Sequence, residues 1–264
     1  VKLSLKVKKF KPEGKLNGAV GNFNALNYVY PKIDWPKKAV KFVESLGLVN
    51  NPLTTQRESG DSLCELFDQL KTVNLVLIGL CQDIWQYASF GYLDLRKDKM
   101  QVGSSTMPQK INPIDFEGAE GNLQLANCLF IFFSSKLPIS RLQRDLTDST
   151  VKRNFGVAFG HTMLGVKMIT EGLSKIKPNS QKMLADLDSD WSILAEAIQV
   201  LLKSEGYTDG YELVKEQTRG KKLSQEDYMN MVTKLSVEKD IKTRLERLTP
   251  LNYIGLADKL VDLL

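Results

Sequence analysis

The chain has 264 residues, of which 42% are hydrophobic and 25% are charged, and its formal net charge is +5. These values are ordinary for a soluble globular protein, and the length suffices for one large or two smaller domains. No apolar run reaches the length of a membrane span and no signal-peptide pattern opens the chain. The mild positive charge gives no argument for nucleic acid, but it is consistent with a basic pocket for a phosphorylated or carboxylate-rich small molecule.

The first residues, from Val1 to Phe10, read like a piece from the middle of a longer protein, so we expect a fragment. Residues 14–31 are rich in glycine and asparagine, which indicates that the backbone approaches another group closely there. A short helix is predicted from about residue 35 to residue 46, followed by a polar loop at residues 50–56.

A long amphipathic helix is predicted from about residue 61 to residue 90. Its apolar residues recur mostly at intervals of three and four. They are Leu63, Leu66, Phe67, Leu70, Val73, Leu77, Leu80 and Ile84. Further apolar residues widen this face, so we expect other helices to surround the helix.

Two more long helices are predicted, from about residue 113 to residue 135 and from about residue 138 to residue 176. The break between them falls at Leu137-Pro138, because a residue before proline is pushed out of helical geometry. Three long helices indicate a bundle, and faces this apolar favour oligomerisation. Shorter helices then follow, at about 180–187, 190–204, 209–217, 224–233, 237–247 and 253–264. The expected fold is therefore all-α, with a long-helix bundle in residues 1–177 and a smaller helical domain in residues 178–264, and no strand is predicted.

The three cysteines, Cys64, Cys81 and Cys128, are widely spaced in apolar helical contexts. This usage argues against a disulfide framework and favours a reducing compartment, so we expect a cytoplasmic protein. The cysteine spacing is not that of metal ligands, and His161 is the single histidine of the sequence. We therefore expect neither a metal site nor a cofactor.

The most informative stretch is the string GSSTMPQKINPIDFE at residues 103–117. Its serines and prolines exclude a regular element, and the charged run before it is poorly suited to burial, so residues 97–113 are predicted to form a loop. After Pro113 the sequence becomes helical, with Asp115 and Glu117 in the first turn. A hydroxyl-rich loop that leads into a helix N-terminus is typical of an anion-binding site. The alternative is a solvent-exposed linker.

This string resembles the signature loop of the fumarase/aspartase superfamily. Within that superfamily, residues 14–264 are most similar to the adenylosuccinate lyase family, through the strings KLNGAVGNFN at 15–24, NPLTTQ at 51–56 and LPISRLQRDLTDSTVKRN at 137–154. The last string separates this branch from fumarases and aspartases, whose substrates lack a phosphate. The resemblance implies a carbon–nitrogen lyase that eliminates fumarate from adenylosuccinate, giving AMP, and from the succinylated aminoimidazole carboxamide ribotide of purine biosynthesis.

The resemblance assigns the chemistry of the elimination to the signature loop. Ser104 is the general base, and Lys110 with the loop amides supplies the cationic surrounding that a serine alkoxide needs. Lys110 and Asn112 hold the succinyl carboxylates, and Ser105 and Met107 also contact substrate. Without the resemblance, Ser104 would be read as capping a turn and Lys110 as pointing to water.

The other site residues also come from the resemblance. Glu117 orients the histidine that acts as general acid, but the family's motif for that histidine is absent and His161 matches no family position, so we expect His161 to be hydrogen-bonded locally. The nucleotide phosphate is bound by Arg144, Ser149 and Arg153, a set that suits a phosphomonoester. Surface ion pairing with Asp145 and Asp148 is the alternative for the two arginines. Gln56 matches a substrate-binding glutamine.

The resemblance further implies a homotetramer whose active sites are shared between subunits, with no nucleic acid or membrane partner. The region that carries the general acid is expected N-terminal to Val1, on the same precursor or on a separate chain. Two alternatives stay open. One is another fumarate-releasing lyase of the argininosuccinate lyase type, and the other is a non-catalytic helical scaffold.

Overall fold

The computed structural model describes residues 2–96, 112–207, 214–215 and 222–263. The chain divides into two compact units, Val1–Lys177 and Pro178–Leu264. Most of the described residues are helical, which confirms the predicted fold class. The expectation of no strands is wrong, because the described ranges contain four strands of two or three residues.

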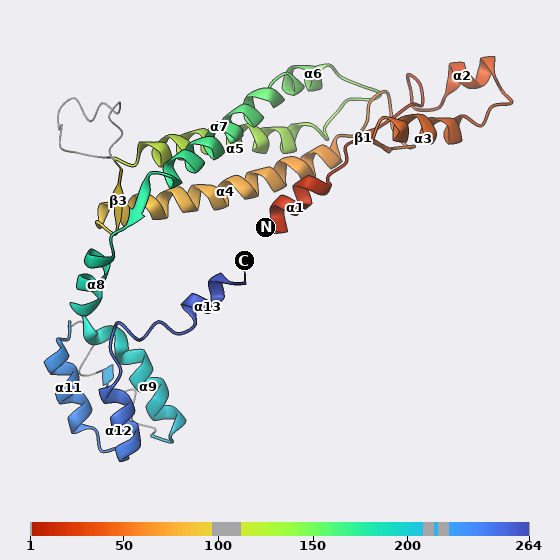
Figure 1. Cartoon of the computed structure of the whole chain (residues 1–264). Helices are drawn as coiled ribbons and strands as arrows, with labels where there is room; N and C mark the ends of the chain where they lie inside the picture. The colour runs from red at the N-terminus through yellow and green to blue at the C-terminus, as the bar shows by residue number, and fades with distance from the viewer. Residues whose placement is uncertain (1, 97–111, 208–213, 216–221, 264) are drawn as a thin grey trace. The chain divides into compact units, whose positions relative to one another are not determined.

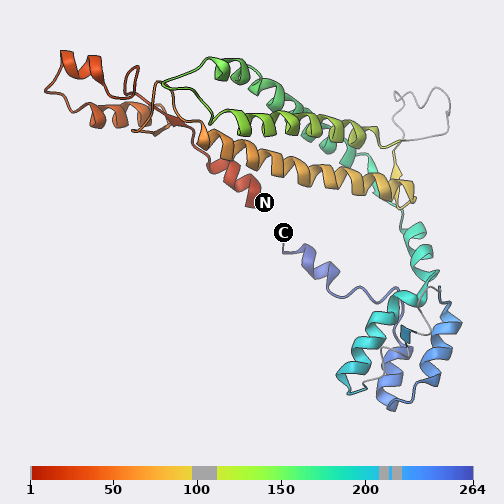
Figure 2. The same ribbon diagram turned by 180° about the vertical axis from the view of Figure 1, so that it is seen from behind.

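The first unit is built around three long helices, α4 (Asp61–Ser89), α5 (Ile114–Lys136) and α7 (Phe155–Leu173), which lie side by side (Figure 1). Helix α5 packs against both α4 and α7, and α1 (Lys2–Lys9) packs against α4. The turned view in Figure 2 shows the same arrangement from behind. None of the described helices is long and apolar enough to cross a membrane.

Two buried clusters fill the bundle. Around Phe67 of α4, the rings of Phe130 and Phe133 from α5 and Phe155 from α7 have centroids 4.9–5.6 Å from its own. The second cluster contains Ile78, Cys81, Ile84, Phe116, Ala119, Leu123 and Ile169. Aromatic side chains bury large areas, so the three helices are fixed mainly by this packing.

A polar layer joins the same three helices. Asn74 of α4 is fully buried, and its Nδ2 donates to Asn127 Oδ1 of α5 at 3.0 Å and to Thr162 Oγ1 of α7 at 3.1 Å. Because a buried amide is costly without partners, these bonds favour one register of the helices over shifted ones.

The predicted single helix over residues 138–176 is wrong. Residues 138–146 are not helical, and a short helix α6 (Thr147–Lys152) precedes α7. Leu142 has a left-handed φ of 47°, which no helix accommodates. The segment is therefore a turn that redirects the chain between α5 and α6.

Smaller elements lie at both ends of the bundle. Strand β1 (Glu13–Gly14) pairs in parallel with β2 (Val49–Asn50), and the short helices α2 (Asn24–Val29) and α3 (Trp35–Ser45) occur between them in the chain. Strands β3 (Leu93–Leu95) and β4 (Ile176–Pro178) pair with each other. Asp34 caps α3 with its side chain, and Asn179 does the same for the first helix of the second unit, as is common for Asp and Asn at a helix start.

The second unit contains α8 (Ser180–Asp188), the 3₁₀ helix η1 (Trp191–Leu194), α9 (Ala195–Ser204), α11 (Gln225–Lys234), α12 (Lys239–Glu246) and α13 (Ala257–Val261). The buried Tyr228 anchors its core, with its hydroxyl donating to Leu245 O at 2.8 Å and its ring against Trp191. Ser224 and Asp227 form a capping box at the start of α11. The predicted helix at 209–217 lies mainly outside the described residues.

Candidate active site

Most of the predicted signature loop lies outside the residues that the structure describes. Ser104, Ser105, Met107 and Lys110 lie outside the described residues. The description resumes at Asn112, which is half-buried and directly precedes Pro113 and α5. The predicted helix start after Pro113 is confirmed, because α5 begins at Ile114.

Glu117 lies in the first turn of α5 and is bound by a residue from α4. The indole Nε1 of Trp85 donates to Glu117 Oε1 at 2.9 Å. One turn further along, Gln82 Nε2 donates to Glu120 Oε1 at 2.9 Å. The carboxylate of Glu117 is exposed and sits at the positive end of the helix dipole. Its position is therefore set from two helices while the side chain stays accessible.

Gln56 lies at the other end of the bundle, in the loop between β2 and α4. Its side chain is exposed, while its backbone N–H donates to Gln143 O at 3.3 Å. The neighbouring Arg57 donates from Nη2 to Leu137 O at 2.8 Å. These two bonds place the Gln56 loop beside the segment that carries Arg144.

The predicted phosphate-binding residues surround α6. Arg144 precedes the helix, Ser149 is half-buried within it, and Arg153 is its exposed C-terminal cap. Arg144 Nη2 lies 3.9 Å from Asp148 Oδ1, and Lys152 Nζ lies 3.2 Å from Asp148 Oδ2. The ion-pair alternative thus holds for Arg144 with Asp148. Within the described part of the chain Arg153 has no ion pair.

Asp148 is the buried carboxylate at the centre of this group, with 4% of its surface exposed. Burial by itself works to raise the pKa of its carboxyl, but the hydrogen bond from Lys152 and the charges of Lys152 and Arg144 outweigh it and hold that pKa below its ordinary value. Arg57 adds to this effect. One buried negative charge is therefore held among three cations, Lys152, Arg144 and Arg57.

The described site residues fall into two groups at opposite ends of the bundle. Asn112 and Glu117 lie at the N-terminus of α5, whereas Gln56 and Arg144 lie close to Leu137, the residue that ends α5. Helix α5 has 23 residues and, at the helical rise, spans about 35 Å. A single copy of this unit does not bring the two groups together.

His161 has the local role that the sequence predicts. It is half-buried on α7, and its Nδ1 lies 2.8 Å from Asn122 Oδ1 of α5. Asn122 in turn donates to Gly118 O at 2.7 Å. The histidine thus joins α7 to α5 within the bundle.

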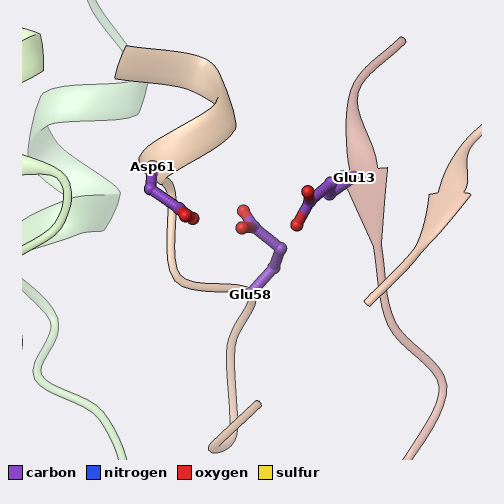
Figure 3. A group of neighbouring side chains, drawn as sticks. All are labelled: Glu13, Glu58 and Asp61. Atoms are coloured by element: carbon purple, nitrogen blue, oxygen red, sulfur yellow. The ribbon is translucent and has the colours of Figure 1, made fainter. Parts of the chain in front are cut away.

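Three acidic side chains meet where β1 approaches the start of α4. Figure 3 shows the carboxylates of Glu13, Glu58 and Asp61 turned toward a common space, and their oxygens lie within 4.8 Å of one another. Donors of the loops already bind them. Asn51 Nδ2 donates to Glu13 Oε2 at 2.8 Å, and the Ser59 hydroxyl lies against both Glu58 and Asp61. We assign no ion to this group.

A cavity of about 510 Å³ lies between α3 and the loops at residues 16–23 and 50–53. Its polar lining comes from Asn17, Asp34, Lys37, Asn50 and Asn51. Of the predicted site residues that the structure describes, none lines this cavity.

Sequence reasoning missed the side chains that hold the site residues in place. No sequence pattern singled out Trp85, and Asp148 was considered only as a surface partner for arginine. Lys15 was quoted within a family string but given no role. The one signal that pointed to Asp148 was its i, i+4 spacing from both Arg144 and Lys152, the spacing of ion pairs on a helix face.

Comparison with known proteins identifies the family. The model described as "Lyase" matches residues 6–125, and the model described as "Adenylosuccinate lyase C-terminal" matches residues 140–254. The adenylosuccinate lyase of Dictyostelium discoideum is 49% identical over 92% of this chain and 53% of its own length. That of Escherichia coli (strain K12) is 45% identical over 94% of this chain and 55% of its own length.

Among solved structures, a fumarate lyase:delta crystallin from Brucella melitensis, bound to cobalt, matches 80% of this chain and 45% of its own, with a TM-score of 0.55 and 18% identity. This likeness establishes the fold of the lyase superfamily. Within that superfamily, the chain belongs to the adenylosuccinate lyase family. It spans about half the length of the curated relatives it matches.

Proposed function

We propose that the protein acts as an adenylosuccinate lyase. It would release fumarate from adenylosuccinate, giving AMP, and from the succinylated aminoimidazole carboxamide ribotide. This proposal rests on one observation, the hydrogen bond that holds the Gln56 loop against the segment of Arg144. In that segment three cations surround the buried Asp148. Guanidinium and ammonium groups suit a phosphate, and the fumarases and aspartases of the superfamily have no phosphate to bind.

The reaction is a β-elimination. Ser104 removes the proton beside a substrate carboxylate, and Lys110 with Asn112 binds the carboxylates, whose negative charge grows as the carbanion forms. The carbon–nitrogen bond then breaks, and a general acid protonates the departing nitrogen. Glu117 orients that acid. Ser105 and Met107 contact the succinyl part, and Gln56, Arg144, Ser149 and Arg153 bind the nucleotide part.

The division of the site between the two ends of the bundle supports a site shared between copies of the chain. If a second copy packs antiparallel to the first, the Glu117 end of one lies beside the Arg144 end of the other. The long helices carry exposed apolar side chains that such packing would cover. They include Leu75, Val76, Leu125, Ile131, Phe132, Met163 and Leu164. We propose the homotetramer as this assembly, and a cytoplasmic location from the cysteine usage.

Fumarate release distinguishes the two lyase readings. The full natural chain is given adenylosuccinate or argininosuccinate, and fumarate is followed by its ultraviolet absorbance. Turnover of adenylosuccinate alone is expected, and Ser104→Ala should abolish it while nucleotide binding persists. Turnover of argininosuccinate instead would reassign the substrate, and turnover of neither would favour the non-catalytic scaffold.

Mixing two inactive variants tests the shared site. Glu117→Gln damages one end of the bundle and Arg144→Ala the other. If each site takes one group from each of two copies, co-refolded mixtures should regain up to about a quarter of wild-type turnover, because both groups are then intact in that share of sites. Mixtures that stay as inactive as the separate variants would exclude a site shared in this way.

A further inference from the structure

Lys15 binds three backbone carbonyls from two segments of the chain. Its Nζ lies 2.8 Å from Gly18 O, 2.8 Å from Thr55 O and 2.8 Å from Gln56 O. An ammonium has three N–H donors and no acceptor, so these contacts use all of them. A neutral amine has only two N–H groups. The three bonds therefore require the charged lysine.

The two segments that Lys15 joins also fit each other closely. The buried Asn17 donates from Nδ2 to Thr54 Oγ1 at 2.8 Å, and Thr54 Oγ1 lies 3.2 Å from Asn17 Oδ1. Gly21 has a φ of 87°, and a Cβ placed there would lie 1.9 Å from Thr54 O. The parallel pairing of β1 with β2 sets this register just before Lys15. The loop at residues 51–57 is thus held against residues 15–21.

Gln56 lies at the centre of this junction. Its carbonyl accepts from Lys15, and its N–H donates to Gln143 O at 3.3 Å. The backbone of Gln56 is therefore fixed on one side by the N-terminal segment and on the other by the residue before Arg144. Its side chain is exposed and has no hydrogen bond within the described residues, so it is free to contact a substrate.

We propose that Lys15 is a positioning residue, which holds the peptide of Gln56 so that its amide side chain and Arg144 act on the same nucleotide. This role rests on the proposed lyase function. Lys15 touches no predicted substrate group and acts through the carbonyls of Thr55 and Gln56. A thioether side chain such as Met keeps the volume of the lysine but offers no donor, and a glutamine offers two donors on a shorter stem.

A double-mutant cycle tests the proposal in the full natural chain with adenylosuccinate. Lys15→Met removes all three hydrogen bonds and should lower kcat/KM roughly tenfold, because the peptide of Gln56 is then no longer held in place. In the Gln56→Ala background the same substitution should change kcat/KM less than twofold, because the side chain that Lys15 positions is already gone. Lys41→Met, at an exposed lysine of α3, is the matched control and should leave kcat/KM unchanged.

Equal losses in both backgrounds would assign Lys15 a general structural role and overturn the proposal, as would no loss in either. If Lys15→Met does not fold, Lys15→Gln replaces it in the cycle. Hydrogen exchange gives a readout without turnover, since the amides of residues 51–57 should exchange faster in the Lys15 variant than in Lys41→Met. If the wild-type chain releases no fumarate, the lyase proposal fails, and unchanged exchange in this loop would separately refute the role of Lys15.

Discussion

Trp85 Nε1 donates to Glu117 Oε1 at 2.9 Å, so that α4 sets the position of a carboxylate on the first turn of α5. An aspartate or glutamate near a helix N-terminus is favoured by the helix dipole, but the dipole does not select one rotamer. The indole does, because it approaches from a neighbouring helix. Glu117 itself is exposed, which leaves its carboxylate accessible to a further group.

Trp85→Phe should therefore lower turnover while leaving the fold intact. Phenylalanine keeps an aromatic ring against the helix face but removes the N–H donor. The loss of one hydrogen bond to a carboxylate at a half-exposed site corresponds to about 1 kcal/mol, or roughly a fivefold fall in kcat. The measurement is kcat for adenylosuccinate in the full natural chain.

The matched control is Tyr87→Phe, which removes a polar group from an exposed aromatic residue two positions further along α4. Its kcat should equal that of the wild type. A Trp85→Phe enzyme with unchanged kcat would show that Glu117 does not depend on the indole.

The sequence was sufficient to predict the helices that have a repeating apolar face. The start of α4 at Asp61 and its end at Ser89 lie close to the predicted bounds, because residues such as Ile78, Cys81 and Ile84 recur at intervals of three and are buried. The turn at residues 138–146 was missed because Leu142 and Leu146 look like core residues in sequence. They are 96% and 72% exposed.

Local sequence patterns also could not predict that the site residues lie in two groups at opposite ends of the bundle. The family resemblance named Gln56, Glu117 and Arg144 together, but their separation depends on the antiparallel packing of α4 against α5. The contacts of Lys15 with Thr55 and Gln56 span 40 and 41 residues. No local pattern encodes contacts of this range, so they could be read only from the fold.

Gly21→Ala should destabilise the protein more than Gly47→Ala. Both glycines have a positive φ, 87° and 78°, which costs an alanine about 1–2 kcal/mol. At Gly47 nothing lies within 4 Å of the added Cβ, whereas at Gly21 the Thr54 carbonyl is 1.9 Å away. Thermal unfolding of the two variants measures the difference. Equal midpoints would mean that the loop at Thr54 shifts without cost.

Two glycines of α7 should respond to alanine with opposite signs. A Cβ at Gly165 would lie 2.7 Å from Leu123 Cγ and 2.9 Å from Leu123 Cδ2, so Gly165→Ala should overpack the contact with α5 and cost about 1–3 kcal/mol. At Gly160 nothing lies within 4 Å. Gly160→Ala should stabilise the helix by about 0.5–1 kcal/mol, because alanine loses less backbone entropy. Urea unfolding midpoints that move in the same direction would contradict this packing of α7.

Asp148→Asn should remove a part of the pH dependence of stability. The folded pKa of the Asp148 carboxyl lies below its unfolded value of about 3.9. A lowered pKa means that the unfolded chain binds the proton more tightly, so the group stabilises the fold above the unfolded pKa and loses that contribution as the pH falls through the folded pKa.

At neutral pH the Asp148→Asn variant should have the lower urea midpoint, because Lys152 and Arg144 lose their buried partner. The difference from the wild type should narrow below about pH 4, where the wild-type carboxylate takes up its proton. Asp61, Asp145, Asp190 and Asp227 also have lowered pKa values, but they are present in both proteins and cancel in the comparison. The proposal would be contradicted by a difference in urea midpoint that is the same at neutral pH and below about pH 4. Asp148 would then act through packing rather than through charge.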